Sequence, residues 1–184
     1  MVEGTSDFTY LRILSEHMHS LGREGLSDRW RMIQSAGTTN MPTFVSLLGN
    51  KLDVTLLIDG TSISMGKLEH LIKRKVLPSK RLIVTDDFAP MDPSDIEDLF
   101  SKSEYLKLYN QAFGTSLKVR DLTGKDRIIA QIGRATRTPF KEHGRPAEAL
   151  LRDPKRQQFL DKLSDTTLGR YEALFNAINA TLSD

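Results

Sequence analysis

The sequence predicts an α/β protein in which a parallel sheet is flanked by helices and followed by a C-terminal helical lobe. The first observation is an alternation of short apolar runs with amphipathic segments in the first half of the chain, which is typical of a parallel sheet. The second is the run from Val54 to Ile58, which is apolar on both faces, as in a strand covered by helices on each side. The third is a change at about Ser94, after which every periodic segment is helical. We therefore expect an α/β core over residues 1–93 and a helical lobe over residues 94–184.

The elements of the core follow from the spacing of apolar residues and from the residues that interrupt them. Apolar side chains recur at spacings of three and four from Phe8 to Leu21, which predicts a helix over residues 7–21 that ends at Gly22. Ser6 or Asp7 is its expected cap. The other expected core elements are a strand over 30–37, a short helix from Pro42, a strand over 54–58, a helix over 65–75 and a strand over 81–88.

Four amphipathic segments make up the expected helical lobe. Their sequences are IEDLFSKSEYLKLYNQAFG, DRIIAQIGRA, PAEALLRDPKRQQFLDKL and TLGRYEALFNAINATL. The last one carries an apolar stripe that starts at Leu168 and ends at Leu182, and we assign this stripe to the protein core.

Composition excludes several classes of protein. The chain has 184 residues, of which 39% are hydrophobic and 27% charged, enough to bury one substantial core. It contains no apolar run of the ~20 residues that a membrane span needs and no signal-peptide pattern, so we expect a cytoplasmic protein without a membrane partner. It has no cysteine, so any metal must be held by oxygen or histidine ligands. Oxygen ligands favour magnesium, manganese or calcium.

Charge is distributed unevenly along the chain. Residues 1–116 carry 13 Lys+Arg against 15 Asp+Glu, whereas residues 117–184 carry 13 against 9. The densest basic stretch lies between Arg134 and Arg156, and a phosphate backbone is a natural partner for it. A solvated helix surface explains the same charges. The residues that we expect to contact DNA are Arg134, Arg137, Lys141, Arg145 and Arg156.

Acidic residues recur at the carboxyl ends of the expected strands or just after them. In an open parallel sheet these ends face one crevice, where ligands bind. Carboxylates that crowd together repel one another unless a counter-charge is present, and a hard divalent cation supplies one. Each acid taken singly also has an ordinary explanation as a turn, surface or helix-terminus residue. The acids concerned are Glu3 with Asp7, Asp59, the pair Asp86 and Asp87, and Glu97 with Asp98.

Two motifs carry a resemblance to a known family. VEGTSD followed by a helix, and LLIDG at the end of a hydrophobic strand, resemble the Toprim domain, the metal-binding α/β module of topoisomerases, primases and certain nucleases. SAGTTNM, DIEDLFSKSEYL and LSDTTLGRYEALFNAIN resemble the C-terminal region of overcoming-lysogenization-defect (OLD) family nucleases. The resemblance spans nearly the whole chain and implies a Toprim-like (Rossmann-like) sheet. It also implies that an N-terminal ABC-type ATPase region precedes this chain in a longer protein.

The resemblance implies metal-dependent cleavage of DNA by an endonuclease with two divalent cations. These are Mg²⁺ or Mn²⁺, with Ca²⁺ as a non-catalytic substitute. Thr61 stands where the family has the second aspartate of a pair, so a hydroxyl replaces one carboxylate. The residues implied as metal ligands are Glu3, Asp7, Asp59, Thr61, Glu97 and Asp98.

A basic residue is expected to stabilise the negative charge that develops on the phosphate during cleavage. The resemblance implies a lysine in this role, and Lys125 in LTGKDRII is our first choice because it follows the acidic pair. Lys141 and Lys162 compete with it, and an exposed loop lysine without a role is an equally good interpretation of Lys125.

Other functions remain as alternatives. The chain could be a catalytically weak Toprim module that binds DNA or forms a homodimer. Topoisomerase chemistry is disfavoured because all four tyrosines lie in amphipathic helical patterns, and a phospho-acceptor receiver domain is disfavoured because the acidic pair follows Asp59 instead of preceding it. A role in phage defence or DNA repair is what the resemblance suggests.

Overall fold

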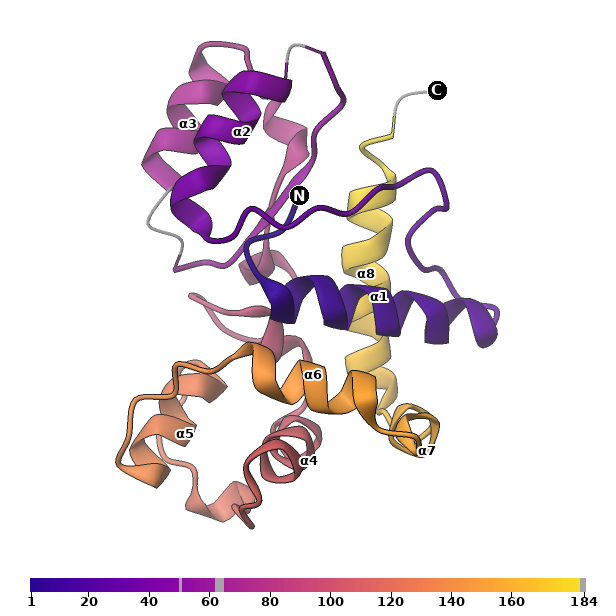
Figure 1. Ribbon diagram of the computed structural model, residues 1–184, viewed down its shortest axis with the longest axis vertical. Helices are drawn as coiled ribbons and strands as arrows, with labels where there is room; N and C mark the ends of the chain where they lie inside the picture. Colours follow the sequence, from indigo (N-terminus) through magenta and orange to yellow (C-terminus); the bar gives the residue numbers. More distant parts are fainter. Residues whose placement is uncertain (50, 62–64, 183–184) are drawn as a thin grey trace.

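The computed structural model describes residues 1–49, 51–61 and 65–182, and in this part of the chain it has a mixed α/β fold. The mixed class and a parallel sheet flanked by helices are confirmed, whereas the Toprim-like arrangement stays a prediction (Figure 1). The α-helices and strands are α1 Thr5–Ser20, α2 Met41–Leu48, β1 Leu56–Ile58, α3 Met65–Lys73, β2 Leu82–Val84, α4 Lys102–Phe113, α5 Ile128–Thr136, α6 Gly144–Arg152, α7 Arg156–Leu160 and α8 Asp165–Asn179. The 3-10 helices are η1 Thr38–Asn40, η2 Ser79–Arg81, η3 Thr85–Asp87, η4 Ile96–Leu99 and η5 Val119–Asp121.

The described sheet consists of β1 and β2, which pair in parallel with Leu57 opposite Ile83. The expected strand over residues 30–37 was wrong. It makes one parallel bridge, between Gln34 and Val2. The pairing stops because the backbone turns directly afterwards, with positive φ angles of 55° at Ala36 and 110° at Gly37.

Helix α1 begins earlier than the sequence predicts. Asp7 is the third residue of the helix and not its cap, and its Oδ2 accepts a hydrogen bond of 2.7 Å from the backbone N–H of Gly4. This bond runs back from the first turn to the residue before the helix, as in a capping box. The helix ends at Ser20, before Gly22, whose φ of 69° suits glycine. The opening turn and α1 are therefore fixed to each other by one carboxylate.

Two of the expected lobe helices are divided. The segment that begins with IEDLF forms the short helix η4, and α4 then begins with Ser101 as its cap, which accepts a hydrogen bond from the backbone N–H of Glu104. The segment that begins with PAEALL splits into α6 and α7. Pro154 lies between them, and it lacks the N–H that a continuous helix would need there.

The helices of the two halves of the chain share one core. Helix α1 packs against α6 and α8, and α6 packs against α4. Figure 1 shows α2 and α3 beside the strands at one end, the α4–α7 group at the other end, and α1 with α8 between them. A second, smaller apolar cluster joins α2, α3 and β1. Within the residues that the structure describes, no helix is both long and apolar enough to cross a membrane.

Candidate functional site

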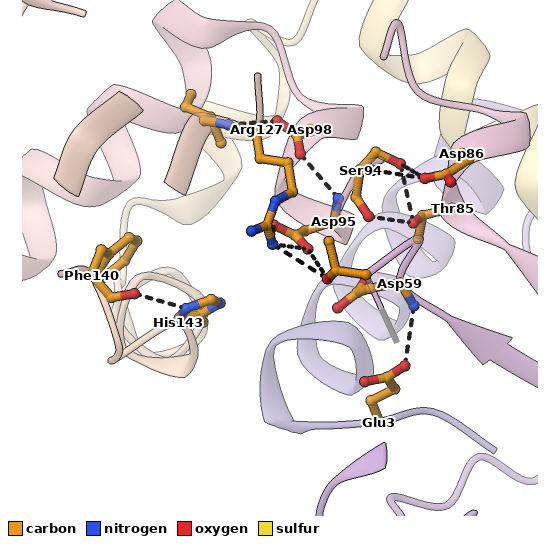
Figure 2. Close-up of polar contacts among 12 residues, drawn as sticks. Glu3, Asp59, Thr85, Asp86, Ser94, Asp95, Asp98, Arg127, Phe140 and His143 are labelled. Atoms are coloured by element: carbon orange, nitrogen blue, oxygen red, sulfur yellow. Dashed lines mark hydrogen bonds and ion pairs between the residues drawn. The ribbon is translucent and has the colours of Figure 1, made fainter. Parts of the chain in front are cut away.

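Three loops that are far apart in the sequence bring their acidic residues together beside the start of α1. Glu3 precedes α1, Asp59 follows β1, and Glu97 lies in η4. The backbone N–H of Asp59 donates a hydrogen bond of 3.2 Å to Oε1 of Glu3, which links the first two loops directly (Figure 2). The prediction that acids from the VEGTSD turn and the LLIDG strand lie near each other is supported by this contact.

Burial and mutual repulsion both act on this carboxylate cluster, which consists of Glu3, Asp7, Asp59, Asp95, Glu97 and Asp98. The pKa of Asp7 is raised to about 7, mainly by burial; the hydrogen bond from Gly4 opposes this rise, and the charges of Glu3 and Asp95 add to it. Burial also raises the pKa of Asp59 to about 10, with added repulsion from the neighbouring acids. The cluster is short of positive charge.

Glu97 is the most deeply enclosed acid of the cluster. Its side chain is 1% exposed, and its Oε1 has no hydrogen-bond partner among the described residues. Burial, followed by the charges of Asp95 and Asp7, raises its pKa well above the ordinary range. A buried polar atom without a partner costs free energy and calls for an explanation. A cation bound to the cluster would supply the missing partner.

Asp98 is bonded mainly to the protein backbone. Its Oδ2 accepts a hydrogen bond of 3.0 Å from the N–H of Asp95, and its Oδ1 accepts one of 2.8 Å from the N–H of Ile128. Burial raises its pKa to about 6, while these two bonds oppose the rise. Asp98 thus joins η4 to the first residue of α5, which gives it a structural role besides the predicted ligand role.

Two residues that sequence reasoning missed are Asp95 and Arg127. Nη1 of Arg127 lies 3.0 Å from Oδ1 and 3.0 Å from Oδ2 of Asp95, and 3.3 Å from Oγ1 of Thr61 (Figure 2). Each lies two residues from a predicted site residue: Asp95 precedes Glu97 and Arg127 follows Lys125. Their pairing joins residues that are 32 positions apart in the sequence, and the spacing of apolar residues does not predict such a contact.

The lysines considered for catalysis lie on the surface. Lys125 is exposed in the loop ahead of α5, and Lys162 is exposed between α7 and α8. Lys141 is also exposed, but it lines a hollow of about 480 Å³ together with Thr5 and Ser6 of α1. The structure therefore places Lys141, among these three, beside the opening turn that contains Glu3.

The predicted DNA-contacting arginines fall into three places. Arg134 and Arg137 line an open hollow of about 370 Å³ together with Arg127. Arg145 lines the hollow of Lys141, and its guanidinium lies 4.4 Å from the centre of the Phe113 ring. Arg156 begins α7 and donates to the carbonyl oxygen of Leu151.

Not every acid at a strand end belongs to the cluster. Asp86 accepts hydrogen bonds of 2.7 Å and 2.8 Å from the backbone N–H and the hydroxyl of Ser94, and so fastens the segment that leads to η4 (Figure 2). The Asp86 carboxyl also lies against Gly60, where any Cβ would collide with it. Asp87 is exposed. Asp86 therefore has a structural position, and Asp87 faces solvent.

The chemistry of the carboxylate cluster fits a hard divalent cation, but its geometry is not that of a finished site. Among the described residues, no group of three or more His, Asp or Glu side chains is arranged to hold a metal ion as it stands. Arg127 supplies positive charge to Asp95 in this structure. A cation would therefore need to draw the carboxylates together. Comparison of the chain with family models, with curated proteins and with solved structures gives no match.

Proposed function

We propose that this chain is a divalent-metal-dependent endodeoxyribonuclease that hydrolyses phosphodiester bonds. The observation that carries the proposal is the carboxylate cluster, in which Oε1 of Glu97 is buried without a hydrogen-bond partner among the described residues. Repulsion among buried carboxylates destabilises the folded protein unless a positive charge balances it. A cluster of this kind at the end of a parallel strand supports cation binding, and cation chemistry on a phosphodiester is what the sequence resemblance implies.

The residues that would hold the cations are Glu3, Asp7, Asp59 and Glu97, with Asp95 added by the structure. Two bound divalent cations, Mg²⁺ or Mn²⁺, would lower the pKa of a bound water and stabilise charge on the leaving oxygen. Thr61 carries a hydroxyl that can hold a water in place of the acid found in the family. The carboxylate oxygens of these aspartates and glutamates would be the cation ligands.

The basic residues near the cluster would bind and orient the DNA. Lys141 and Arg145 border the hollow at the start of α1, and Arg137 borders the hollow next to Arg127. Phosphate oxygens accept hydrogen bonds from such side chains, and the association depends on salt because counterions are released. The position of Lys141 beside the VEGTSD turn makes it a better candidate for contact with the scissile phosphate than Lys125.

The experiment is incubation of the purified chain with supercoiled plasmid in Mg²⁺, Mn²⁺ or Ca²⁺, with Glu3→Ala and Glu16→Ala alongside. Glu16 is an exposed acid of α1 that pairs with Arg12, so its removal controls for loss of a carboxylate on the same helix but outside the cluster. We expect nicking or linearisation in Mg²⁺ or Mn²⁺ by the wild type and by Glu16→Ala. Loss of cleavage is expected in Glu3→Ala. Equal cleavage by both variants contradicts the proposal.

A second candidate is a Toprim module that binds DNA or forms a homodimer without cleaving. It is favoured by one observation, the contact of Arg127 with Asp95 and Thr61, which places a positive charge where a cation would otherwise balance the acids. Such a module would bind Mn²⁺ weakly and would not cleave at any cation concentration. Titration with Mn²⁺ followed by calorimetry separates the two candidates.

The proposed partners beyond DNA are an ABC-type ATPase region of the same full-length protein and a second copy of the chain. Both come from the sequence resemblance. The resemblance also suggests a role in phage defence or DNA repair. Leu47 and Leu52 are 67% and 59% exposed, and either partner could cover these apolar residues.

A further inference from the structure

We propose that Arg127 is an exchangeable counter-cation, which balances Asp95 in the cation-free protein and is displaced from it when a divalent cation enters the carboxylate cluster. This inference rests on the proposed function, since it assumes that the cluster binds such a cation. It goes beyond that function because it gives Arg127, which has no part in the predicted site, a defined effect on cation affinity.

The first step of the argument is the imbalance of charge. Asp95 is 2% exposed and receives Nη1 of Arg127 at 3.0 Å from each carboxylate oxygen. Within the described residues, no lysine, arginine or histidine forms an ion pair with Asp7, Asp59 or Glu97. Arg127 therefore supplies one positive charge to a site that holds several carboxylates. A divalent cation placed among them brings more charge than Arg127 does and relieves more of the repulsion.

The second step is the geometry of the ion pair. All three contacts of Arg127 with Asp95 and Thr61 use the single nitrogen Nη1. The strongest arginine–carboxylate pairs use two nitrogens in a fork, with two parallel hydrogen bonds. The observed pair lacks that arrangement, and the Arg127 side chain is 28% exposed whereas that of Asp95 is 3% exposed. Arg127 can therefore move towards solvent, and the carboxylate stays in place.

The third step is where the displaced guanidinium can go. Arg127 lies directly before α5 and borders the open hollow that is also lined by Arg134 and Arg137. Arg134 pairs with Asp126 at this hollow, and this pair does not involve Arg127. Three arginines around one hollow suit a phosphate group. Entry of a cation would thus release a phosphate-binding side chain next to the cluster.

The test is calorimetric titration of the full chain with Mn²⁺, using Arg127→Gln and the matched control Arg152→Gln. Arg152 is an exposed arginine of α6 that pairs with Glu148, so the control loses the same charge outside the cluster. We expect Arg127→Gln to bind Mn²⁺ at least about fivefold more tightly than the wild type, because the competing charge is gone. Arg152→Gln should bind as the wild type does. Equal or weaker binding by Arg127→Gln overturns the inference alone, and no Mn²⁺ binding by any of these proteins overturns the proposed function as well.

A second measurement on the wild type does not depend on the folding of a variant. The guanidinium N–H signals of Arg127 in NMR spectra report whether the side chain stays in its ion pair. Saturation with diamagnetic Mg²⁺ should shift these signals and speed their exchange with water. Signals that stay unchanged in the Mg²⁺-saturated protein overturn the displacement.

Discussion

Glu97 and Glu104 are both buried glutamates of the segment that carries η4 and α4, but their carboxyl groups have opposite environments. Glu104 accepts hydrogen bonds of 2.9 Å from the N–H of Ser101, 2.7 Å from the N–H of Ser164 and 2.5 Å from the hydroxyl of Thr167. Burial opposes its ionisation, yet these bonds outweigh burial and lower its pKa. Glu97 has an unpartnered Oε1 and a raised pKa. The Glu104 carboxylate is stabilised by hydrogen bonds within the fold, whereas the Glu97 carboxyl has an oxygen without a hydrogen-bond partner among the described residues.

This contrast predicts different results for the same substitution at the two positions. In EDTA, Glu104→Gln should lower the free energy of unfolding by roughly 1–3 kcal/mol, because a charged acceptor of several hydrogen bonds is lost. Glu97→Gln should leave that free energy unchanged or raise it, since glutamine removes only a carboxyl that is hard to ionise. Chemical denaturation measures both values. A large destabilisation by Glu97→Gln would show that its carboxylate holds the fold together.

Stability without a cation should fall as the pH rises. The folded protein holds protons on Asp98 up to a pKa of about 6 and on Asp7 up to about 7, whereas both release them near 3.8 when unfolded. The stabilisation from these neutral forms is therefore full below about pH 4 and is lost as the pH passes through 6 and 7. A pKa change of one unit corresponds to about 1.4 kcal/mol, so the changes at Asp7 and Asp98 together set an upper limit of roughly 7 kcal/mol on this loss.

Thermal unfolding between pH 5 and pH 8, in EDTA and in Mg²⁺, checks this sign. We expect the unfolding temperature in EDTA to fall over this range, and Mg²⁺ to raise it more at pH 8 than at pH 5, because the cation binds ionised carboxylates. Asp7→Asn is the matched variant, since its amide oxygen can still accept the bond from Gly4. It should flatten the curve in EDTA. An unfolding temperature that rises towards pH 8 without a cation contradicts the argument.

The sequence predicted those parts of the fold that depend on local periodicity. The apolar spacing along α1 and α8 placed both helices within a few residues of their observed limits, and β1 lies inside the expected run. The strand expected over residues 30–37 failed because strand formation needs a partner along its length, which no local pattern reveals. The break between α6 and α7 at Pro154 was predictable from the sequence, because proline lacks the backbone N–H that a continuous helix needs.

The candidate site was predictable to the extent that it follows from topology. Acids placed at the end of β1 and in the VEGTSD turn were expected to meet, and the contact of Asp59 with Glu3 brings them together. The contact of Arg127 with Asp95 could not be predicted. It depends on how the loop before α5 packs against η4, and this is decided by tertiary contacts such as the bond from Ile128 to Asp98.

Glu3 offers a test that separates the position of an atom from its charge. Glu3→Gln retains an oxygen that can accept the 3.2 Å bond from the N–H of Asp59, whereas Glu3→Ala removes it. Both should abolish Mn²⁺-dependent plasmid cleavage, because loss of a carboxylate ligand disrupts a cation site. Only Glu3→Ala should also weaken the join between the two loops, by about 1 kcal/mol in the free energy of unfolding. Cleavage retained by Glu3→Gln would remove Glu3 from the ligand set.

The basic hollows predict how DNA affinity depends on salt. Charge reversal of Arg137 or Lys141 should weaken binding to duplex DNA of any sequence and reduce the slope of log affinity against log salt by about 1, as loss of a phosphate contact does. Arg156→Glu should have a smaller effect, because Arg156 lies at α7 and donates to the carbonyl oxygen of Leu151. Fluorescence anisotropy at several salt concentrations measures the slopes. If Arg137→Glu and Lys141→Glu leave the slope of the wild type unchanged, DNA does not lie across the hollows beside the carboxylate cluster.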